Sequence, residues 1–178
     1  MSKSSIEVSS LQLNAGQKAI AILLIEDDLA EARLIKEILQ NFDLNRFVLT
    51  HVQRLQTGLN RLKQEQFDLI LLDLTLPDSQ GLSSVELLVQ NFAHLPIVVL
   101  TNTNDNQLAI EAVRRGAQDF LVKRKINIEV LVRSIQYAIE RQKASDLLRE
   151  TNENLTNQIQ QKTSELMKAK EINHFQSE

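Results

Sequence analysis

The sequence predicts a doubly wound α/β fold, in which helices cover both faces of a parallel sheet. Five short apolar runs recur along the chain, and their length and branched side chains are typical of strands. Most runs are apolar at successive positions, as expected of strands buried on both faces. They are Ala21–Ile25, Phe47–Leu49, Leu69–Leu72, Ile97–Leu100 and Phe120–Val122. Helices must therefore lie between them.

Helix start signals occupy the segments between these strands. Three residue pairs have the spacing of a capping box, which satisfies the free N–H groups of a first helical turn: Asp28 with Glu31, Ser83 with Glu86, and Asn104 with Gln107. Gly116 suits the left-handed position that ends the helix begun near Asn104. Right-handed crossovers between five such strand–helix units lead to one domain over residues 19–142.

The segments that flank this domain differ from it. Residues 1–18 are rich in Ser, Gln and Asn, which predicts a flexible N-terminal tail. From Asn127 to beyond Lys170 there is neither Pro nor Gly, so the last helix should continue past the domain through residues 143–178.

The extension carries a weak coiled-coil seam. Apolar residues with a spacing of three and four form a stripe, which Asn152, Lys162 and Asn173 interrupt. The apolar members are Leu148, Leu155, Ile159, Leu166 and Ala169. A polar Asn in a seam can fix register and partner number, so a parallel homodimer is expected. The alternative is a solvated single helix.

Composition argues against several functional classes. The 178 residues carry a net charge of -3 and have a pI near 5.7, which argues against a basic face for nucleic acid. There is no Cys, and hence no disulfide, thiolate chemistry or cysteine zinc site. The sequence also lacks a long apolar run and the pattern of a signal peptide. We therefore expect a cytoplasmic protein without nucleic-acid or membrane partners.

Acidic residues follow the first and third strands. Glu26, Asp27 and Asp28 follow the first, and Asp73 follows the third. Ligands of doubly wound sheets bind at the carboxyl ends of strands, so these acids share one crevice if the two strands are neighbours. Asp28 is the predicted cap of the next helix, which leaves the other acids for a ligand.

Placing Glu26 and Asp27 beside Asp73 brings like charges together. Each close pair costs about 1 to 4 kcal/mol, depending on the effective dielectric. A hard divalent cation offsets this repulsion, and Mg²⁺ suits an all-oxygen site that leaves room for a phosphoryl group. An ordinary solvated loop cluster is the alternative.

The fourth and fifth strands add polar groups to the same edge. Thr101 supplies a hydroxyl and Lys123 supplies a cation. Alone, each is more often an ordinary strand-end or solvated residue. Together with the carboxylates they provide what phosphoryl transfer requires, namely a nucleophile and groups that hold the transferred oxygens.

With these motifs in place, residues 19–142 closely resemble the receiver domain of bacterial response regulators. The matching segments are Leu24–Asp28, Leu71–Pro77 with Gly81, Leu100–Thr101 and Asp119–Lys123. The resemblance implies a flavodoxin-like sheet of strand order 2-1-3-4-5. It also implies that Asp73 accepts a phosphoryl group from the phosphohistidine of a histidine kinase or a phosphotransfer protein.

The resemblance implies roles for further residues. Mg²⁺ would be bound by Glu26, Asp27, Asp73 and the main-chain carbonyl of Thr75. On phosphorylation Thr101 would move toward the phosphoryl group, Lys123 would pair with it, and Phe120 would turn inward. Plain core packing is the alternative for Phe120. These changes would shift a population of conformations on the face of the fourth helix, fifth strand and fifth helix.

The match departs from the family pattern around the switch residues. Arg124 follows Lys123 in place of the usual Pro, and Asn102 follows Thr101 in place of a small residue. Thr75 and Thr103 stand where side chains influence access of water to the acyl phosphate. The lifetime of the phosphoryl group is therefore not predicted.

Residues 147–170 resemble the signalling helices that join sensory modules to enzymes. Residues 171–178 are similar to the segment that leads into the dimerisation helix of sensor histidine kinases. We therefore expect the receiver of a hybrid histidine kinase, with the kinase catalytic domain outside this chain and His174 not its phosphorylated histidine. A stand-alone regulator and a receiver linked to a diguanylate cyclase are the alternatives.

Proteins of other classes fit less well. A dehalogenase-type phosphatase needs a second acid two residues after its nucleophile, where this chain has Thr75. A flavodoxin-like carrier needs a hydroxyl-rich phosphate loop after the first strand, where three acids would repel the flavin phosphate. An unphosphorylated coiled-coil protein would leave the carboxylates unexplained.

Overall fold

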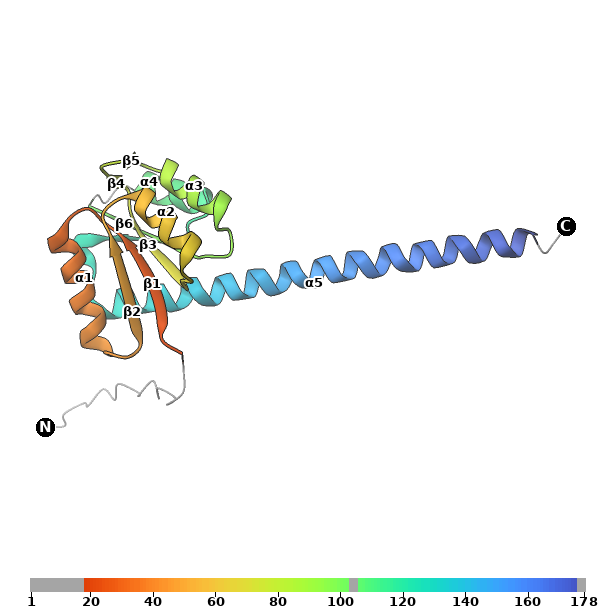
Figure 1. The fold of residues 1–178 in the computed structure, drawn as a ribbon, viewed down its shortest axis with the longest axis horizontal. Coiled ribbons are helices and arrows are strands. Elements are labelled where there is room, and N and C mark those ends of the chain that lie inside the picture. The colour runs from red at the N-terminus through yellow and green to blue at the C-terminus, as the bar shows by residue number, and fades with distance from the viewer. Residues whose placement is uncertain (1–17, 103–105, 176–178) are drawn as a thin grey trace, which may run out of the picture.

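The computed structural model describes residues 18–102 and 106–175 of the protein. Its main sheet is five-stranded and parallel, with strand order β2-β1-β3-β6-β7 (Figure 1). The strands are β1 (Ile20–Ile25), β2 (Phe47–Val52), β3 (Leu69–Asp73), β6 (Ile97–Thr101) and β7 (Asp119–Val122). The predicted fold is confirmed. The predicted strand order 2-1-3-4-5 is confirmed as well, since β6 and β7 are the fourth and fifth strands of this sheet. Strand β2 extends beyond the predicted end at Leu49.

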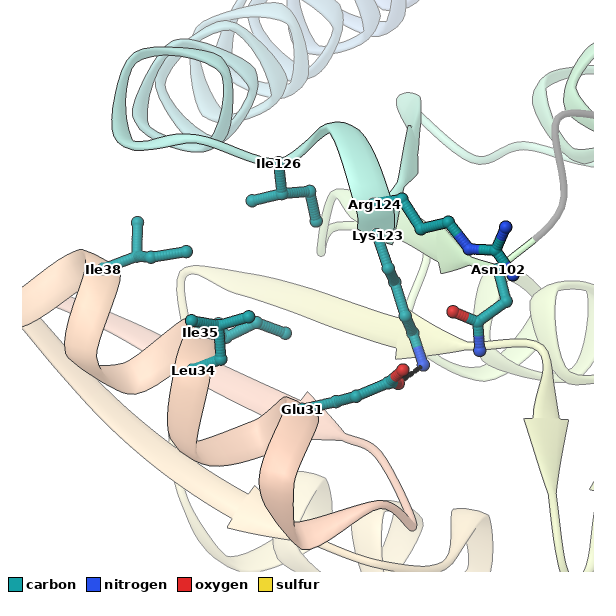
Figure 2. A pocket seen from close by; sticks show the side chains of 8 residues that line it. All are labelled: Glu31, Leu34, Ile35, Ile38, Asn102, Lys123, Arg124 and Ile126. Atoms are coloured by element: carbon teal, nitrogen blue, oxygen red, sulfur yellow. Dashed lines mark hydrogen bonds and ion pairs between the residues drawn. The ribbon is translucent and has the colours of Figure 1, made fainter.

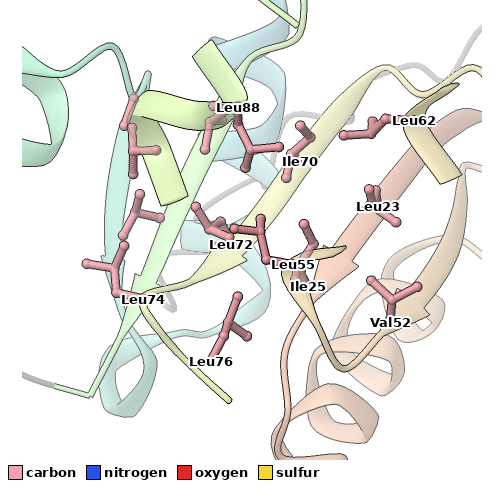
Figure 3. Close-up of a cluster of buried hydrophobic side chains, with 14 of the residues drawn as sticks. Leu23, Ile25, Val52, Leu55, Leu62, Ile70, Leu72, Leu74, Leu76 and Leu88 are labelled. Carbon is pink, nitrogen blue, oxygen red and sulfur yellow. The ribbon is translucent and has the colours of Figure 1, made fainter. Parts of the chain in front are cut away.

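Helices cover both faces of this sheet. They are α1 (Leu29–Phe42), α2 (Leu55–Gln64), α3 (Ser83–Asn91), α4 (Asn106–Arg114) and α5 (Ile128–Phe175). Side chains of α2, α3 and α4 share one core with Leu23 and Ile25 of β1, part of which Figure 3 shows. Side chains of α1 and α5 share the other core with Ile22 and Leu24. Each fully buried aliphatic side chain contributes about 1.5 to 3 kcal/mol, so the sheet is the stable platform of the domain.

The observed helix caps agree only in part with the caps predicted from the sequence. Asp28 caps α1, because its carboxylate accepts hydrogen bonds from the N–H groups of Ala30 and Glu31. The prediction that Ser83 caps α3 is wrong. Leu82 occupies the cap position without a side-chain hydrogen bond, and Ser83 is the first helical residue, with its hydroxyl turned back to the carbonyl of Gln80.

The end of α4 is the tight turn that Gly116 predicts. The φ angle of Gly116 is 106°, a backbone conformation that L residues rarely adopt. The N–H of Gly116 donates to the Val113 carbonyl, and that of Ala117 donates to the Ala112 carbonyl, both at 3.0 Å. This pattern is a Schellman motif. Asn104, which is predicted to cap the start of this helix, lies outside the described residues.

The loop after β3 contains a short hairpin that the sequence did not reveal. Strand β4 (Thr75–Leu76) pairs antiparallel with β5 (Ser79–Gln80). Asp78, in the intervening turn, accepts hydrogen bonds from the N–H groups of Leu55 and Gln56 at 3.0 and 2.9 Å. Asp78 therefore caps α2, whose own cap residue Arg54 makes no side-chain cap bond.

Helix α5 has two parts that differ in burial. Leu131, Val132, Ile135 and Ala138 pack under the sheet, and Gln142 is the last buried residue. Beyond it the helix continues unbroken and projects far from the domain (Figure 1). Side chains from 143 to 170 are exposed except for the half-buried Asp146. The predicted continuous helix is confirmed.

Hydrogen bonds fix the helix where it leaves the domain. The Gln142 side-chain amide donates to the Ala93 carbonyl at 3.1 Å and to the Asp146 carboxylate at 3.2 Å. The Gln118 amide donates to the Gln142 side-chain oxygen at 3.2 Å. The direction of the projecting part is thus set by loops that precede β6 and β7.

Some predictions fall outside the described parts of the chain. The N-terminal tail lies outside them apart from Lys18, as do the side chains of Asn173 and His174. Every peptide bond in the described ranges is trans, including the one that joins Lys123 to Arg124. Across residues 18–102 and 106–175, no helix combines the length and apolar character needed to cross a membrane.

Replacing Gly116 with Ala should destabilise the domain more than the same change at Gly81. Both glycines have positive φ, which costs an L residue about 1 to 2 kcal/mol. At Gly116 the added Cβ would also lie 2.9 Å from Cγ2 of Val89, whereas at Gly81 no atom lies within 4 Å. Urea unfolding of Gly116→Ala and Gly81→Ala measures the difference. Equal losses would contradict the predicted contact with Val89.

Candidate functional site

The carboxyl end of β1 presents two carboxylates in different environments. Glu26 is fully buried, whereas Asp27 is exposed. The N–H of Asp28 donates to Oε1 of Glu26 at 3.1 Å, and the ring of His51 lies 2.7 Å from the Glu26 carbonyl oxygen. Burial raises the pKa of Glu26 to about 7, against the opposing effect of Lys123, and the nearby Asp73 adds to the rise.

Asp73 is the last residue of the central strand β3, and it is buried. In the sheet β3 lies between β1 and β6, and Asp73 is in register with Leu100 of β6. Burial raises the pKa of Asp73, while Lys123 and the N–H of Thr75 oppose the rise. The Asp73 carboxylate is thus buried, with the Lys123 ammonium and the N–H of Thr75 directed at it.

Glu26, Asp27 and Asp73 form a candidate metal site. One carboxylate oxygen of each lies within 4.8 Å of the others. Oε2 of Glu26 is buried, and it lies 2.6 Å from Nζ of its ion-pair partner Lys123. Because all three side chains offer carboxylate oxygens, the cluster fits a hard cation such as Mg²⁺. The main-chain carbonyl of Thr75, the fourth predicted ligand, belongs to the first residue of β4.

Lys123 lies directly after β7, at the start of a short 3₁₀ helix, η1 (Lys123–Lys125). Its ammonium forms ion pairs with Glu26 at 2.6 Å, with Asp73 at 3.4 Å, and with Glu31 of α1 (Figure 2). Burial alone would favour the neutral amine, but the carboxylates of Glu26 and Glu31 outweigh it and raise the pKa of Lys123. The site therefore contains one buried cation among several acids.

The two remaining predicted residues lie on neighbouring strands. Thr101 ends β6 and is buried, and in the sheet it is in register with Val122 of β7. Phe120 of β7 is partly buried and packs against the core on the side of α2, α3 and α4. The structure thus brings Glu26, Asp27, Asp73 and Lys123 together and places Thr101 at the same edge, whereas Phe120 lies further back along β7.

Two residues at the site have roles that sequence reasoning missed. Glu31 was expected to complete a capping box with Asp28, but its carboxylate turns to Lys123. Asp78 fixes the loop after β3 by capping α2. Burial alone would raise the pKa of Asp78, but these hydrogen bonds, that of its own N–H and the charge of Arg54 together hold the pKa below its usual value. Neither role has a local signal, because each partner is distant in the sequence.

A recess opens beside the candidate metal site. It has a volume of about 450 Å³, and Figure 2 shows that its lining comes from α1, from the segment after β7 and from Asn102, which follows β6. Leu34, Ile35, Ile38 and Ile126 form an apolar wall, and Glu31, Lys123, Arg124 and Asn102 supply polar groups. The site therefore adjoins a partly apolar surface.

A family model described as the response regulator receiver domain matches residues 22–136. The match includes β1 from Ile22 onward, the other four strands of the main sheet, the three clustered carboxylates, Thr101 and Lys123.

Curated relatives show the same similarity in sequence. The swarming motility regulation protein RssB of Serratia marcescens is 37% identical over 57% of this chain and 45% of its own length. The regulatory protein LuxO of Vibrio cholerae is 33% identical over 56% of this chain and 21% of its own length. The chain thus spans less than half the length of these two relatives.

Solved structures show the similarity in three dimensions. A signal receiver domain from Vibrio parahaemolyticus has a TM-score of 0.64 and 28% identity, and the match covers 73% of this chain and 97% of that one. A CheY-like receiver domain protein from Methanospirillum hungatei has a TM-score of 0.62 and 22% identity, over 71% of this chain and 98% of that one. The second of these supports the fold alone.

Magnesium should stabilise the protein more at about pH 8 than at about pH 6, because the cation requires ionised Glu26 and its pKa is raised to about 7. Without the cation, the contribution of Glu26 to stability changes with pH in the opposite direction. The folded state holds the Glu26 proton that an unfolded chain releases near 4.5, so this residue lowers stability as pH rises from 4.5 to about 7. Thermal unfolding with and without MgCl₂ measures both effects.

The control for this prediction separates Glu26 from general charge effects. Glu26→Gln should lose the pH-dependent part of the magnesium effect, whereas Glu37→Gln, on the exposed side of α1, should retain it. A magnesium effect that is the same at both pH values in the wild type, or that keeps its pH dependence in Glu26→Gln, would contradict the assignment.

Proposed function

Because the chain belongs to the response regulator receiver domain family, we propose that Asp73 is its phosphoacceptor in a two-component phosphorelay. The observation that carries this proposal is the position of Asp73, which is buried at the end of the central strand with Glu26, Asp27 and Lys123 around it. The donor would be a phosphohistidine of a histidine kinase or a phosphotransfer protein.

The transfer is a displacement at phosphorus. A carboxylate oxygen of Asp73 attacks, the P–N bond to the donor imidazole breaks, and an acyl phosphate P–O bond forms. The imidazole leaves with the electron pair and takes up a proton. The N–H of Thr75 and the ammonium of Lys123, which both act on the Asp73 carboxylate, orient it for the attack.

Glu26, Asp27, Asp73 and the main-chain carbonyl of Thr75 would hold a magnesium ion. When bound, the ion would neutralise negative charge on the transferring oxygens. The closeness of the three carboxylates, each with one oxygen within 4.8 Å of the others, supports this arrangement. Lys123 is the protein's own cation for the phosphoryl oxygens, and it already lies 3.4 Å from Asp73.

Thr101 and Phe120 would carry the change away from the site. In this proposal the Thr101 hydroxyl moves toward the phosphoryl group, and Phe120 turns into space that opens near β6. Their places at the end of β6 and within β7 support this, since both strands adjoin α4 or α5. The result is a shift between conformations of the face formed by α4, β7 and α5.

Helix α5 would transmit this shift to an output module. We place the boundary of the receiver near Gln142, where burial of α5 ends, and assign residues 143–178 to a signalling helix. The path from Lys123 to this helix is short, since η1 begins at Lys123 and ends at Lys125, and α5 begins at Ile128. The hydrogen bonds of Gln142 would couple the domain to the direction of the helix.

The exposed part of α5 would pair with a second copy in a parallel coiled coil. Leu148, Leu155, Ile159 and Leu166 expose half or more of their surface, although large apolar side chains favour burial. They lie along one seam with Asn152, which would fix the register. Packing of this seam would also stabilise a long helix that otherwise lacks tertiary contacts.

Two observations favour different output modules. The sequence of the projecting helix favours a histidine kinase, with this receiver located before it in the cytoplasm. The names of relatives favour a regulator of another kind, since they include LuxO and the transcriptional regulatory protein ZraR of Escherichia coli. With such an output the full protein would contact nucleic acid, although this acidic chain would not.

Acetyl phosphate with magnesium should phosphorylate the protein at a single position. Intact-mass spectrometry should show the addition of one phosphoryl group, and Asp73→Asn should abolish it because the nucleophilic oxygen is lost. Asp68→Asn is the matched control, since that carboxylate lies at the opposite end of β3 and accepts a hydrogen bond from Ala21. Absence of labelling in the wild type, or labelling of Asp73→Asn, would refute the proposal.

Leu155→Lys should shift the protein from dimer to monomer, because it places a charge in the proposed seam. Leu147→Lys is the matched control, since Leu147 is also an exposed leucine of the same helix but lies off the seam. Sedimentation equilibrium on the full chain measures the mass of each variant. A monomeric wild type, or equal loss of dimer in both variants, would contradict the parallel coiled coil.

A further inference from the structure

The ammonium of Lys123 is shared unequally among its acidic neighbours. It contacts Glu31 and lies 2.6 Å from Glu26, but it is 3.4 Å from Asp73. The cation that would hold the phosphoryl group is therefore held mainly by other carboxylates in this structure. Any movement toward Asp73 requires these contacts to loosen.

Glu31 differs from Glu26 in what else it can do. Glu26 is buried and belongs to the carboxylate cluster that fits a metal ion. Glu31 is on α1, is 31% exposed at its side chain, and is not part of the metal cluster found among the described residues. The contact with Lys123 is thus the interaction that the structure assigns to the Glu31 carboxylate.

The cap of α1 does not need this carboxylate. Asp28 satisfies the N–H groups of Ala30 and Glu31 with its own side chain. In a capping box Glu31 would in turn accept from the N–H of Asp28, but that N–H donates to Glu26 at 3.1 Å. The Glu31 side chain extends instead to Lys123, as Figure 2 shows.

We infer that Glu31 is a positioning residue that competes with Asp73 for the Lys123 ammonium and so restrains phosphorylation. This inference rests on the proposed function of Asp73. A phosphoryl group on Asp73 adds negative charge at that position and attracts the ammonium more strongly than the carboxylate alone. Lys123 then exchanges Glu31 for the phosphoryl oxygens, and the tie between α1 and the start of η1 is released.

Removing the charge of Glu31 should therefore make Lys123 more available. With saturating magnesium, Glu31→Gln should accelerate phosphorylation by acetyl phosphate about threefold or more, a coupling typical of charged side chains in contact. Intact-mass spectrometry follows the rate. Glu37→Gln removes the same charge from an exposed position of the same helix and should leave the rate unchanged.

A second comparison identifies Lys123 as the route of the effect. In a Lys123→Gln background, at an acetyl phosphate concentration that still labels this variant, Glu31→Gln should give no acceleration. Acceleration that persists there would show a general effect of the lost negative charge and would overturn the inference. So would an unchanged rate in Glu31→Gln alone. Failure of the proposed function is distinct, because the wild type would then take up no phosphoryl group or Asp73→Asn would still take one up.

Discussion

Like charges meet at the carboxyl edge of the sheet, and the fold supplies one buried cation to hold them. Glu26 and Asp73 are buried there with the exposed Asp27 beside them, and Lys123 reaches both buried acids. In a medium of low dielectric such charges interact strongly, so the position of each partner matters more than it would at the surface. Strands β1 and β3 and the start of η1 place these groups next to one another.

The same cation connects the site to the rest of the domain. Through Glu31 it reaches α1, and through the short η1 segment it adjoins the start of α5. Helices α1 and α5 pack on one face of the sheet and share a core. A change in the ion-pair partners of Lys123 therefore acts on the region where these two helices pack together. A packed core tends to switch between discrete arrangements rather than deform gradually.

Helix α5 combines a buried segment with an exposed one in a single rod. The buried segment takes its stability from the sheet, and the network around Gln142 sets the angle at which the rod leaves. The exposed segment has no such support in the single chain, since long helices in water gain most of their stability from packing. Its apolar stripe is consistent with a partner that provides this packing. Rigid coupling and a paired rod together would suit transmission over a distance.

Local sequence patterns determined the framework of this protein. Five apolar runs predicted the strands, Asp28 and Gly116 predicted two helix boundaries, and the absence of Pro and Gly after Asn127 predicted the long helix. Each of these rests on contacts within a few residues or on burial of a whole segment, both of which leave a periodic signal. The meeting of acids at one edge followed from the same logic, while their roles remain predictions.

Only the tertiary structure decided which side chains serve one another across the domain. Asp78 caps α2 from the turn between β4 and β5, and Glu31 extends to Lys123 rather than closing its own helix cap. Residues 23 and 92 positions apart form these contacts, so no local spacing could indicate them. Crossovers between parallel strands bring such segments together, and the side chains then choose among partners that become available only after the sheet has formed.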